Sequence, residues 1–396
     1  MYLITKAKLN FLLTIIAAYA LTAVVHSKAQ AEPEKAEKAS GRLVFETSVT
    51  RDDLQGLNSV ELSADGRFAY ATPWPIGAVV VFERDARKGA LTHVQTLRNP
   101  GLLAGDTGIT FSPSTNLAVA ACFNAKTAVL MRCDPKTGKL TILNSARDGE
   151  KNVTGLDFAI DAIFSPDGKH VYVLNGGHGG IAIFKMRENK LEWLESFTGE
   201  DNCLANSRGA AFDPKGNTLY VTSADANTLT VLTRDPQSGL LKVKQVIHDE
   251  EDGVEGLGGA FGVVCTGDGQ FIYTTSGRFS GDSAVSVFRR NDQGKLELVH
   301  ELIAPRDNLP FFDGGNRLTL SPDEKNLYVA ATRSGSVACF ARDSKSGRIK
   351  HMETLTQDED SKGIVAGAAG IAISPDGKYV YVAAEERATI SIFRRE

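Results

Sequence analysis

The chain repeats one short pattern seven times, and this repetition restricts the possible fold more than any single residue does. In each repeat an apolar segment leads into a turn such as Ser-Pro-Asp-Gly, and a strand-like segment such as LYVTS follows. The turns begin at intervals of 48 to 55 residues, at Ser63, Ser112, Ser165, Asp213, Thr266, Ser321 and Ser374. Four-stranded units of this length predict an all-β fold, a seven-bladed β-propeller in which each sheet buries its faces against its neighbours.

The fourth repeat shows how the sequence encodes one blade. Strands are predicted over residues 209–212, 219–223, 229–233 and 241–247, which are rich in β-branched and aromatic residues. The first two are joined by Asp-Pro-Lys-Gly, a favourable turn because proline fixes φ at its second position and glycine accepts positive φ at its last. We find no convincing helical periodicity after Ser40.

The two ends of the chain together make one complete blade. The seventh repeat stops at Glu396, after its third strand, and residues 41–46 match the sequence pattern of a fourth strand. We therefore expect the N-terminal strand to complete the last four-stranded antiparallel blade and close the ring, so that residues 41–396 form one domain. Closure removes two sheet edges that would otherwise be open to aggregation.

The first 31 residues have the features of a secretory signal peptide. Lys6 and Lys8 precede an uncharged run from Phe11 to Val25, and Ala29-Gln30-Ala31 provides a small-x-small cleavage site. The uncharged run is shorter than the roughly 20 residues that a membrane-spanning helix needs. We expect cleavage after Ala31, a disordered leader over residues 32–40, no membrane span in the mature chain, and a periplasmic or extracellular location.

The charge of the mature chain excludes some classes of partner. Loss of residues 1–31 removes three lysines and no acid, so the net charge changes from −4 to −7. An acidic chain without a basic tract is not expected to bind nucleic acid or anionic lipid. We expect a monomer whose partner is a small-molecule lactone or carbohydrate, or a protein or glycan on the variable loops.

The five cysteines do not form a disulfide or metal-binding pattern. Cys339 occupies an apolar strand position and is predicted to be a buried thiol, while Cys122 and Cys133 lie at opposite ends of one predicted hairpin, too far apart for a bridge. Acidic runs at 249–252 and 358–360 lack the spacing of known Ca²⁺ loops. We expect no cofactor, and Ca²⁺ is the one metal left open.

The two faces of such a ring differ in their loops. The turns after the first and third strands of each repeat are monotonous, whereas the loops after the second strand and between blades vary in length and chemistry. Variable loops on a rigid scaffold are where binding sites are usually built. We therefore expect the functional face at the channel mouth that the variable loops surround.

The segments FSPDGKHVYV, ISPDGKYVYVAA and TVLTRDPQSGLLKV resemble those of the seven-bladed lactonase-type propellers, a family that includes 6-phosphogluconolactonase and a fungal muconate lactonising enzyme. The resemblance extends over residues 41–396 and implies the same fold and hydrolysis of a cyclic ester. The resemblance implies a set of functional positions, of which only the fourth-blade arginine is kept, as Arg208. The family's histidine positions fall here on Phe158, Ile160 and Gly209, its glutamate on Ala224 (next to Asp225) and its sixth-blade arginine on Thr332 (next to Arg333).

Lactone hydrolysis requires a group that activates water and a cation or donor that stabilises the developing oxyanion. We expect Arg208 to hold a substrate anion or the oxyanion, and Asp161, Asp225 or His178 to act as the base. The structural alternatives are that Arg208 pairs with an acid of a neighbouring blade and that His178 is a solvated loop residue. The remaining candidate ligand-binding residues are Arg317, Asn316, Arg333 and Asn175.

Two functions of different classes fit these observations. The first is an exported lactonase-like hydrolase that acts on a sugar lactone or a similar small cyclic ester at the channel mouth. The second is a non-catalytic propeller that recognises a protein, a glycan or a component of the cell envelope on its variable face. A lyase or isomerase of the muconate-lactonising kind is a third and more distant alternative.

Overall fold

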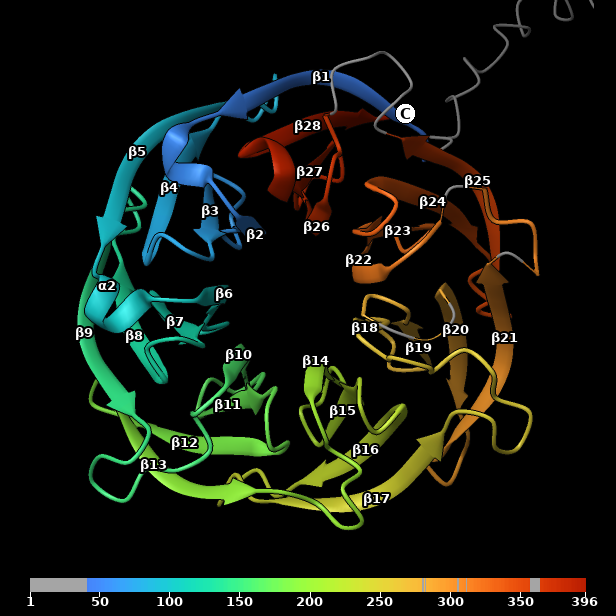
Figure 1. The fold of residues 1–396 in the computed structure, drawn as a ribbon, viewed down its shortest axis with the longest axis horizontal. Helices are drawn as coiled ribbons and strands as arrows, with labels where there is room; N and C mark the ends of the chain where they lie inside the picture. Colours follow the sequence, from blue (N-terminus) through green and yellow to red (C-terminus); the bar gives the residue numbers. More distant parts are fainter. Residues whose placement is uncertain (1–40, 280, 282, 305, 311, 357–363) are drawn as a thin grey trace, which may run out of the picture. The chain divides into compact units, whose positions relative to one another are not determined.

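The computed structural model describes residues 41–279, 281, 283–304, 306–310, 312–356 and 364–396, which form a ring of seven four-stranded antiparallel sheets (Figure 1). The predicted seven-bladed propeller is therefore confirmed. Within the described ranges, helical structure is limited to α2 (Pro100–Leu103) and the 3-10 turns η1 (Asp52–Leu54) and η2 (Glu385–Arg387). The predicted signal peptide and leader, residues 1–40, lie outside the described residues.

Each blade contributes one strand to each of four concentric positions. The innermost strands are β2 (Leu57–Leu62), β6 (Asp106–Phe111), β10 (Ala159–Phe164), β14 (Ser207–Phe212), β18 (Val263–Cys265), β22 (Gly315–Leu320) and β26 (Ala368–Ile373). The second strands are β3 (Phe68–Pro73), β7 (Leu117–Cys122), β11 (His170–Asn175), β15 (Thr218–Ser223), β19 (Phe271–Thr275), β23 (Asn326–Ala331) and β27 (Tyr379–Ala384). The third strands are β4 (Ala78–Arg84), β8 (Thr127–Cys133), β12 (Ile181–Arg187), β16 (Thr228–Arg234), β20 (Ser283–Arg290), β24 (Ser336–Arg342) and β28 (Thr389–Arg395). The outer strands are β5 (Leu91–Arg98), β9 (Leu140–Arg147), β13 (Lys190–Phe197), β17 (Leu241–His248), β21 (Leu296–Ala304), β25 (Ile349–Thr356) and β1 (Leu43–Thr50).

The ring closes between the two ends of the chain, as the sequence predicts. Strand β1 pairs antiparallel with β28, from Leu43 opposite Arg395 to Thr50 opposite Thr389. Strand β1 thereby becomes the outer strand of the seventh blade, next to β28, β27 and β26 (Figure 1). No sheet of the ring lacks a fourth strand, so closure leaves no blade incomplete.

The hydrophobic core consists of seven clusters of buried side chains, one at each interface between neighbouring blades. The second strands are buried along their whole length, because both of their faces pack against another blade. Six of these strands place a fully buried tyrosine seven residues after the start of the preceding turn: Tyr70, Tyr172, Tyr220, Tyr273, Tyr328 and Tyr381.

Five of these six tyrosines, all except Tyr220, donate a hydrogen bond to a glycine carbonyl oxygen of the adjoining blade. The Tyr172 hydroxyl donates to the carbonyl oxygen of Gly239 at 2.7 Å and accepts from Nε of Arg234, at the end of β16, at 2.8 Å. Nη2 of Arg234 reaches the Asp167 carboxylate, in the turn of the preceding blade, at 3.0 Å. Equivalent contacts join Arg84 to Tyr381 and Asp376, and Arg395 to Tyr328 and Asp323. The repeated Tyr, Arg and Asp residues therefore have a structural role.

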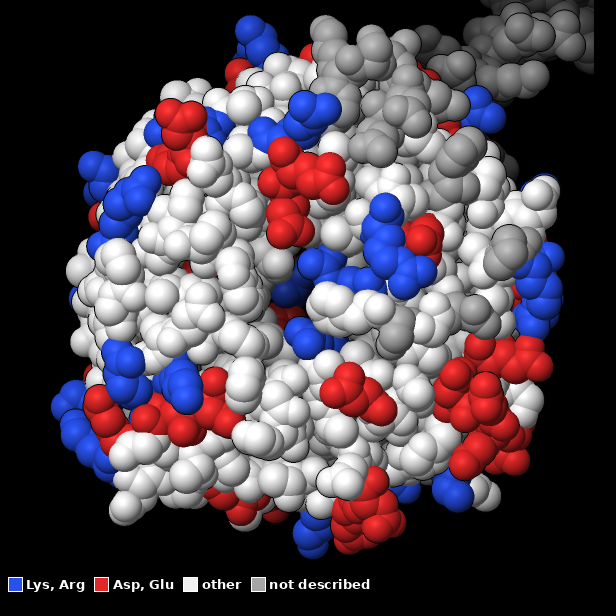
Figure 2. Space-filling view, viewed as in Figure 1, with Lys and Arg blue, Asp and Glu red and all other residues white. Residues whose placement is uncertain are grey.

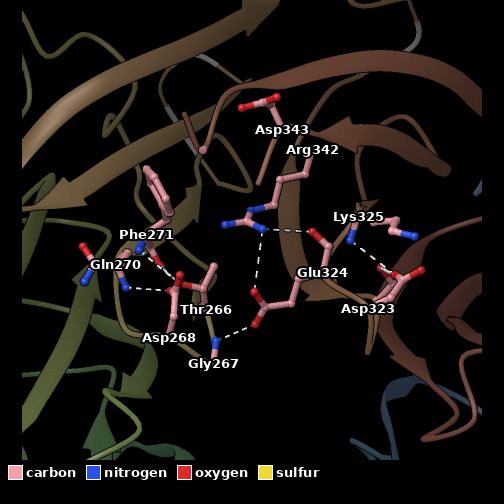
Figure 3. Close-up of polar contacts among 12 residues, drawn as sticks. Thr266, Gly267, Asp268, Gln270, Phe271, Asp323, Glu324, Lys325, Arg342 and Asp343 are labelled. Atoms are coloured by element: carbon pink, nitrogen blue, oxygen red, sulfur yellow. Dashed lines mark hydrogen bonds and ion pairs between the residues drawn. The ribbon is translucent and has the colours of Figure 1, made fainter. Parts of the chain in front are cut away.

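Between the fifth and sixth blades this contact uses a different acid (Figure 3). Nε of Arg342 donates to the Tyr273 hydroxyl at 2.5 Å, but its nearest carboxylate is Glu324, at 3.6 Å, from its own blade. Glu324 also accepts from the amide of Gly267 in the fifth blade at 2.5 Å. A glutamate in the turn thus connects the two blades where an aspartate does so elsewhere.

Between the second and third blades the Tyr–Arg–Asp contact is replaced at all three positions. The tyrosine position holds Val119, the aspartate position Ser114 and the arginine position Met186. Met186 packs instead against the apolar cluster of this interface, which contains Val119. Replacement of all three residues together is consistent with the cost of burying a charge, because an arginine without its acid and hydroxyl partners would be a buried, unpaired charge.

The thiol predictions agree with the structure. All five cysteines are free, and Cys339 is fully buried. Among the described residues no helix is both long and apolar enough to cross a membrane.

Candidate active site in the central channel

The seven innermost strands line the channel, and alignment on their turns shows which side chains meet there. The residues four places before the turns are Ser59, Gly108, Asp161, Gly209, Gly262, Arg317 and Gly370. Only Asp161 and Arg317 carry charge at this level, and they come from the third and sixth blades, across the ring. The four glycines leave the space at this level open.

Asp161 and Arg317 form an ion pair across the channel. Nη1 of Arg317 lies 3.1 Å from Oδ2 of Asp161, and the side chains are 23% and 20% exposed. Nη2 of Arg317 donates to the carbonyl oxygen of Thr107 at 3.3 Å. A Cβ atom at Gly108 would lie 3.1 Å from Asp161 Oδ1 and 3.3 Å from Arg317 Nη2, so glycine at 108 leaves room for the pair.

A pocket of 330 Å³, the upper pocket, opens at the channel mouth above this pair, within the size range of small-molecule sites. Its lining comes from the inner strands, from loops that follow second strands and, for Phe261, from the connection between two blades: Asn58, Trp74, Thr107, Phe123, Ile160, Arg208, Phe261, Arg278, Phe279, Asn316, Arg317 and Glu385. The pocket therefore lies on the face of the variable loops. Figure 2 shows basic side chains around the hollow at the ring axis.

Two arginines of the upper pocket stack on the same aromatic rings. The Arg208 guanidinium lies 5.7 Å from the ring centre of Phe261 and 4.8 Å from that of Phe279. The Arg278 guanidinium lies 5.5 and 5.3 Å from the same two rings. Nε of Arg208 is buried without a hydrogen-bond partner, and no acid forms an ion pair with Arg208 within the described part of the chain. Burial, together with the charge of Arg278, lowers the pKa of Arg208 to about 10.

Arg278 is held at the mouth by the two following blades. Its Nη1 donates to the Thr332 hydroxyl, and its Nη2 lies 3.9 Å from Glu385. Thr332 is the position at which the lactonase-type resemblance implies an arginine. The guanidinium of Arg278, from the fifth blade, thus lies beside the sixth-blade position where the resemblance implies an arginine and this chain has Thr332.

A smaller space of 90 Å³, the lower cavity, continues from the upper pocket into the channel. It shares Arg208, Phe261 and Arg317 with that pocket and is also lined by Glu61 and Asp161. This volume is enough for about three water molecules. Burial raises the pKa of Glu61 to about 7, and the charge of Asp161 adds to this rise while Arg317 opposes it.

A third carboxyl group, Asp106, lies at the start of β6. It is fully buried, its Oδ1 accepts from the amide of Gly108 at 3.2 Å, and its Oδ2 has no hydrogen-bond partner. Burial raises the pKa of Asp106 well above its usual range, and the neighbouring charge of Asp161 contributes to the rise. The three carboxyl groups Glu61, Asp106 and Asp161 thus all act on the guanidinium of Arg317.

The predicted residues of the third-blade loop lie outside both cavities. The His178 side chain is 83% exposed, with Nε2 3.3 Å from Oδ2 of Asp157. Asn175 is buried, donates to Asp157 and accepts from the amide of Gly177 at 2.8 Å. These contacts shape the loop, and neither residue lines the upper pocket or the lower cavity.

The other candidates lie at different distances from the channel. Asp225 is exposed and accepts from Asn206 at 2.8 Å, and Arg333 pairs with Asp313, and neither lines a cavity of the channel. Asn316 lines the upper pocket, but its amide donates to Thr332 and to the carbonyl oxygen of Ala369 at 3.0 and 2.8 Å. Of the predicted residues, the structure brings Arg208, Asp161, Arg317 and Asn316 together.

Among the described residues, no group of three or more His, Cys, Asp or Glu side chains is arranged to hold a metal ion. Asp249, at the start of one acidic run considered for Ca²⁺, instead accepts from the amide of Leu257 at 2.8 Å. The other acidic run, residues 358–360, lies outside the described residues.

Sequence reasoning missed Glu61, Asp106, Arg278 and Phe279. Glu61 was detectable, because it is the only charged residue two places before a turn in any repeat. Arg278 and Phe279 lie in a loop with no repeated pattern, so only the ring geometry brings them to the mouth.

Comparison with known proteins agrees with this architecture. The sequence profile of the family described as "Lactonase, 7-bladed beta-propeller" matches residues 29–158 and 161–361, more than half of the chain. The 6-phosphogluconolactonase of Bacillus subtilis is 25% identical over 187 residues, which cover 47% of this chain and 50% of that protein. The matched part therefore spans about half the length of that relative.

Two solved structures share the fold at low identity. The periplasmic gluconolactonase of Pseudomonas aeruginosa aligns with a TM-score of 0.62 and 16% identity, covering 76% of this chain and 85% of that one. The hydrazine synthase of Kuenenia stuttgartiensis aligns with a TM-score of 0.65 and 18% identity, covering 89% and 98%. At such identities the likeness concerns the fold alone. By its sequence profile and its seven blades, the chain belongs to the lactonase family of seven-bladed β-propellers.

Proposed function

We propose that the protein hydrolyses a sugar lactone or a similar small cyclic ester in the upper pocket. The observation that carries this proposal is the pair of arginines, Arg208 and Arg278, of which Arg208 forms no ion pair with an acid in the described part of the chain. A guanidinium that is partly desolvated and unpaired is a strong donor to a carboxylate, a phosphate or an oxyanion. Membership of the lactonase family supports the same reaction class.

The geometry suggests a division of roles. Arg208 borders both the upper pocket and the lower cavity, so we place the ester carbonyl beside it, where the guanidinium stabilises the oxyanion. Arg278 lies toward the mouth and faces an anionic substituent. The base is a carboxylate of the lower cavity, where Asp161 is the one member of the predicted set Asp161, Asp225 and His178 that lines it.

The test is turnover of a panel of lactones, including glucono-1,5-lactone and its 6-phosphate, by the wild-type protein and two variants. We expect Arg208→Ala to lower kcat/KM by about 100-fold or more, as removal of an oxyanion donor does elsewhere. Arg333→Ala is the matched control, because Arg333 pairs with Asp313 outside both cavities. Absence of turnover on every lactone by a folded wild-type protein would overturn the enzymatic proposal.

A second function is favoured by a row of aromatic side chains along the mouth. Trp74 and Phe123 have ring centres 5.1 Å apart, Phe123 and Phe158 4.9 Å, and Phe158 and His178 5.9 Å. These residues come from three successive blades and are partly exposed or, for His178, largely exposed. Such a row suits stacking of sugar rings, and we propose glycan binding as the alternative. Binding of oligosaccharides that Trp74→Ala abolishes, without any lactone turnover, would support it.

We further propose that the protein acts outside the cytoplasm. The support is the sequence of residues 1–31, with its basic start, uncharged run and Ala-Gln-Ala site. N-terminal sequencing of the protein from fractionated cells tests this, and a start at Glu32 is expected. An intact Met1 in protein recovered from the cytoplasm would contradict export.

A further inference from the structure

Glu61 is the one carboxyl group of the lower cavity that is held by no other side chain. It lines the cavity together with Asp161, Arg208 and Arg317, and within the described residues its carboxyl group forms no hydrogen bond or ion pair. Asp161, by contrast, has Oδ2 in the ion pair with Arg317 and Oδ1 as acceptor of the amide of Ala162 at 2.9 Å. Of the two acids, Glu61 is therefore the one free to accept a proton.

The charges around Glu61 come from four other blades. Asp161 on β10 and Arg317 on β22 act on it directly, and Arg208 on β14 lines the same cavity. Asp106 on β6 acts on the Asp161–Arg317 pair. The neighbouring β26 contributes Ile371, which is apolar. Since Arg317 is already in contact with Asp161, it neutralises only part of the negative charge near Glu61.

We propose that Glu61 is the catalytic base of the lactonase reaction, taking a proton from a water molecule in the lower cavity as that water attacks a lactone in the upper pocket. The inference rests on the proposed function. Asp161 is then a positioning residue that fixes Arg317 across the channel, and Arg208 stands between the two spaces, beside the reacting carbonyl.

The reaction balances without a further reactant. The water oxygen forms a bond to the carbonyl carbon, the carbonyl electron pair moves to the oxygen beside Arg208, and the water proton passes to Glu61. When the tetrahedral intermediate collapses, the bond to the ring oxygen breaks and that oxygen takes the proton from Glu61. The product is the open hydroxy acid, and Glu61 returns to its ionised form.

The environment of Glu61 suits this role near neutral pH. Burial raises the pKa of its carboxyl group to about 7, so a substantial fraction is ionised at neutral pH and its conjugate acid is strong enough to reprotonate the leaving oxygen. The mechanism therefore predicts that kcat/KM falls as the pH decreases below about 7, because Glu61 becomes protonated.

The test compares pH profiles of lactone hydrolysis for wild-type protein, Glu61→Gln, Glu61→Asp and Asp161→Asn. Glu83→Gln is the matched control, because Glu83 is an exposed acid on β4 of the same blade. We expect Glu61→Gln to lose about 100-fold or more in kcat and to lose the fall in rate below pH 7, with KM changed much less. Glu61→Asp should have a lower maximal rate than wild type but the same fall in rate at acidic pH. Glu83→Gln should match wild type in both.

Asp161→Asn separates the base from the positioning residue. If Glu61 is the base, the rate of Asp161→Asn still falls at acidic pH, but the fall begins at a lower pH than in wild type. The reason is that the negative charge of Asp161, which opposes ionisation of Glu61, is gone and Arg317 is released from its ion pair. Two results would overturn the role of Glu61 and leave the lactonase function standing. One is an Asp161→Asn variant whose rate no longer falls at acidic pH; the other is a folded Glu61→Gln variant that keeps both this fall and the wild-type kcat. A wild-type protein that opens no lactone overturns both.

Discussion

Asp161 and Arg317 are 156 positions apart in the sequence, and their side chains meet in the middle of the ring at 3.1 Å. They occupy the same place in their repeats, four residues before the turn, in blades that face each other across the channel. Arg317 borders both the upper pocket, open to the variable face, and the lower cavity, which Asp161 and Glu61 also line.

We expect Asp161→Asn to lower the free energy of unfolding by about 2 kcal/mol. Both side chains are about four-fifths buried, so the loss lies between that of a surface ion pair and that of a fully buried one. Urea denaturation of the single variants and of Asp161→Leu/Arg317→Met measures it. The double variant should recover part of the loss, because it removes both members of the ion pair together, and a double variant less stable than either single variant would contradict this account.

Gly108→Ala should disturb the same pair without changing any charge. The added Cβ would lie 3.1 Å from Asp161 Oδ1 and 3.3 Å from Arg317 Nη2, closer than ordinary contacts, so the pair must shift. We expect a loss of about 1 kcal/mol in unfolding free energy and a reduced rate of lactone hydrolysis. Gly101→Ala is the control, because its nearest neighbour would be Asn99 Oδ1 at an ordinary 3.5 Å. Equal effects of both substitutions would argue against a role for this contact.

Arg84→Met tests the polar contact between the seventh and first blades. The Arg84 side chain is 3% exposed and bonds to Tyr381 and Asp376, so its loss removes one hydrogen bond of a buried hydroxyl and the ion pair of a carboxylate. A destabilisation of about 3 kcal/mol is expected from thermal or urea unfolding. Arg333→Met, which breaks a pair that is 41% and 49% exposed, should cost less than about 1 kcal/mol. If the two variants lose the same amount, burial does not decide the strength of these contacts.

We expect the buried His170 to make the free energy of unfolding depend on pH. The imidazole is fully buried, and its Nδ1 accepts from Nη2 of Arg234 at 2.8 Å. Burial, with the charge of Arg234, lowers the pKa of His170 from 6.5 to about 4. The unfolded chain therefore binds a proton on this residue at a higher pH than the folded chain. The stabilisation by the neutral form is fully present above pH 6.5 and is lost as the pH falls from 6.5 to about 4, by up to about 3 kcal/mol.

His170→Phe should remove this component, since Phe68 and Phe271 hold the same position in the first and fifth blades. The measurement is urea unfolding at several pH values between 4 and 7. We expect the stability of the variant to depend less steeply on pH than that of wild type in this window. Parallel curves for the two proteins would contradict this account, because they would show that the pKa of His170 is the same in the folded and the unfolded chain.

Much of the fold follows from local signals in the sequence. Each turn is encoded by proline and glycine at fixed positions, and each strand by β-branched and aromatic residues beside it. In the fourth repeat the predicted strands differ from the observed ones by at most two residues at either end. The missing strand at the C-terminus and the spare one at the N-terminus indicated how the ring closes, because an unpaired strand would leave an open edge.

The candidate site was only partly accessible to the same reasoning. Arg208 was selected because it matches the arginine of the lactonase-type resemblance, Asp161 as a possible base, and Arg317 as a polar residue at the start of an inner strand. The structure places all three on one cavity. His178 and Asp225 carry suitable chemistry but lie away from that cavity, since a loop residue's direction is not encoded by the repeat. Arg278 reaches the mouth through contacts with two later blades, Thr332 on one and Glu385 on the other.

The sequence by itself determined the number of blades, the strand order, the closure of the ring and the face on which loops vary. These properties depend on short segments whose turn chemistry and apolar pattern act over a few residues. Only the tertiary structure decided that Asp161 meets Arg317, that Glu61 lies beside them with no hydrogen-bond partner among the described residues, and that Arg278 joins Arg208 on shared aromatic rings. The reason is geometric: ring closure brings together residues from blades far apart in the chain, and burial in the channel then raises the pKa of Glu61.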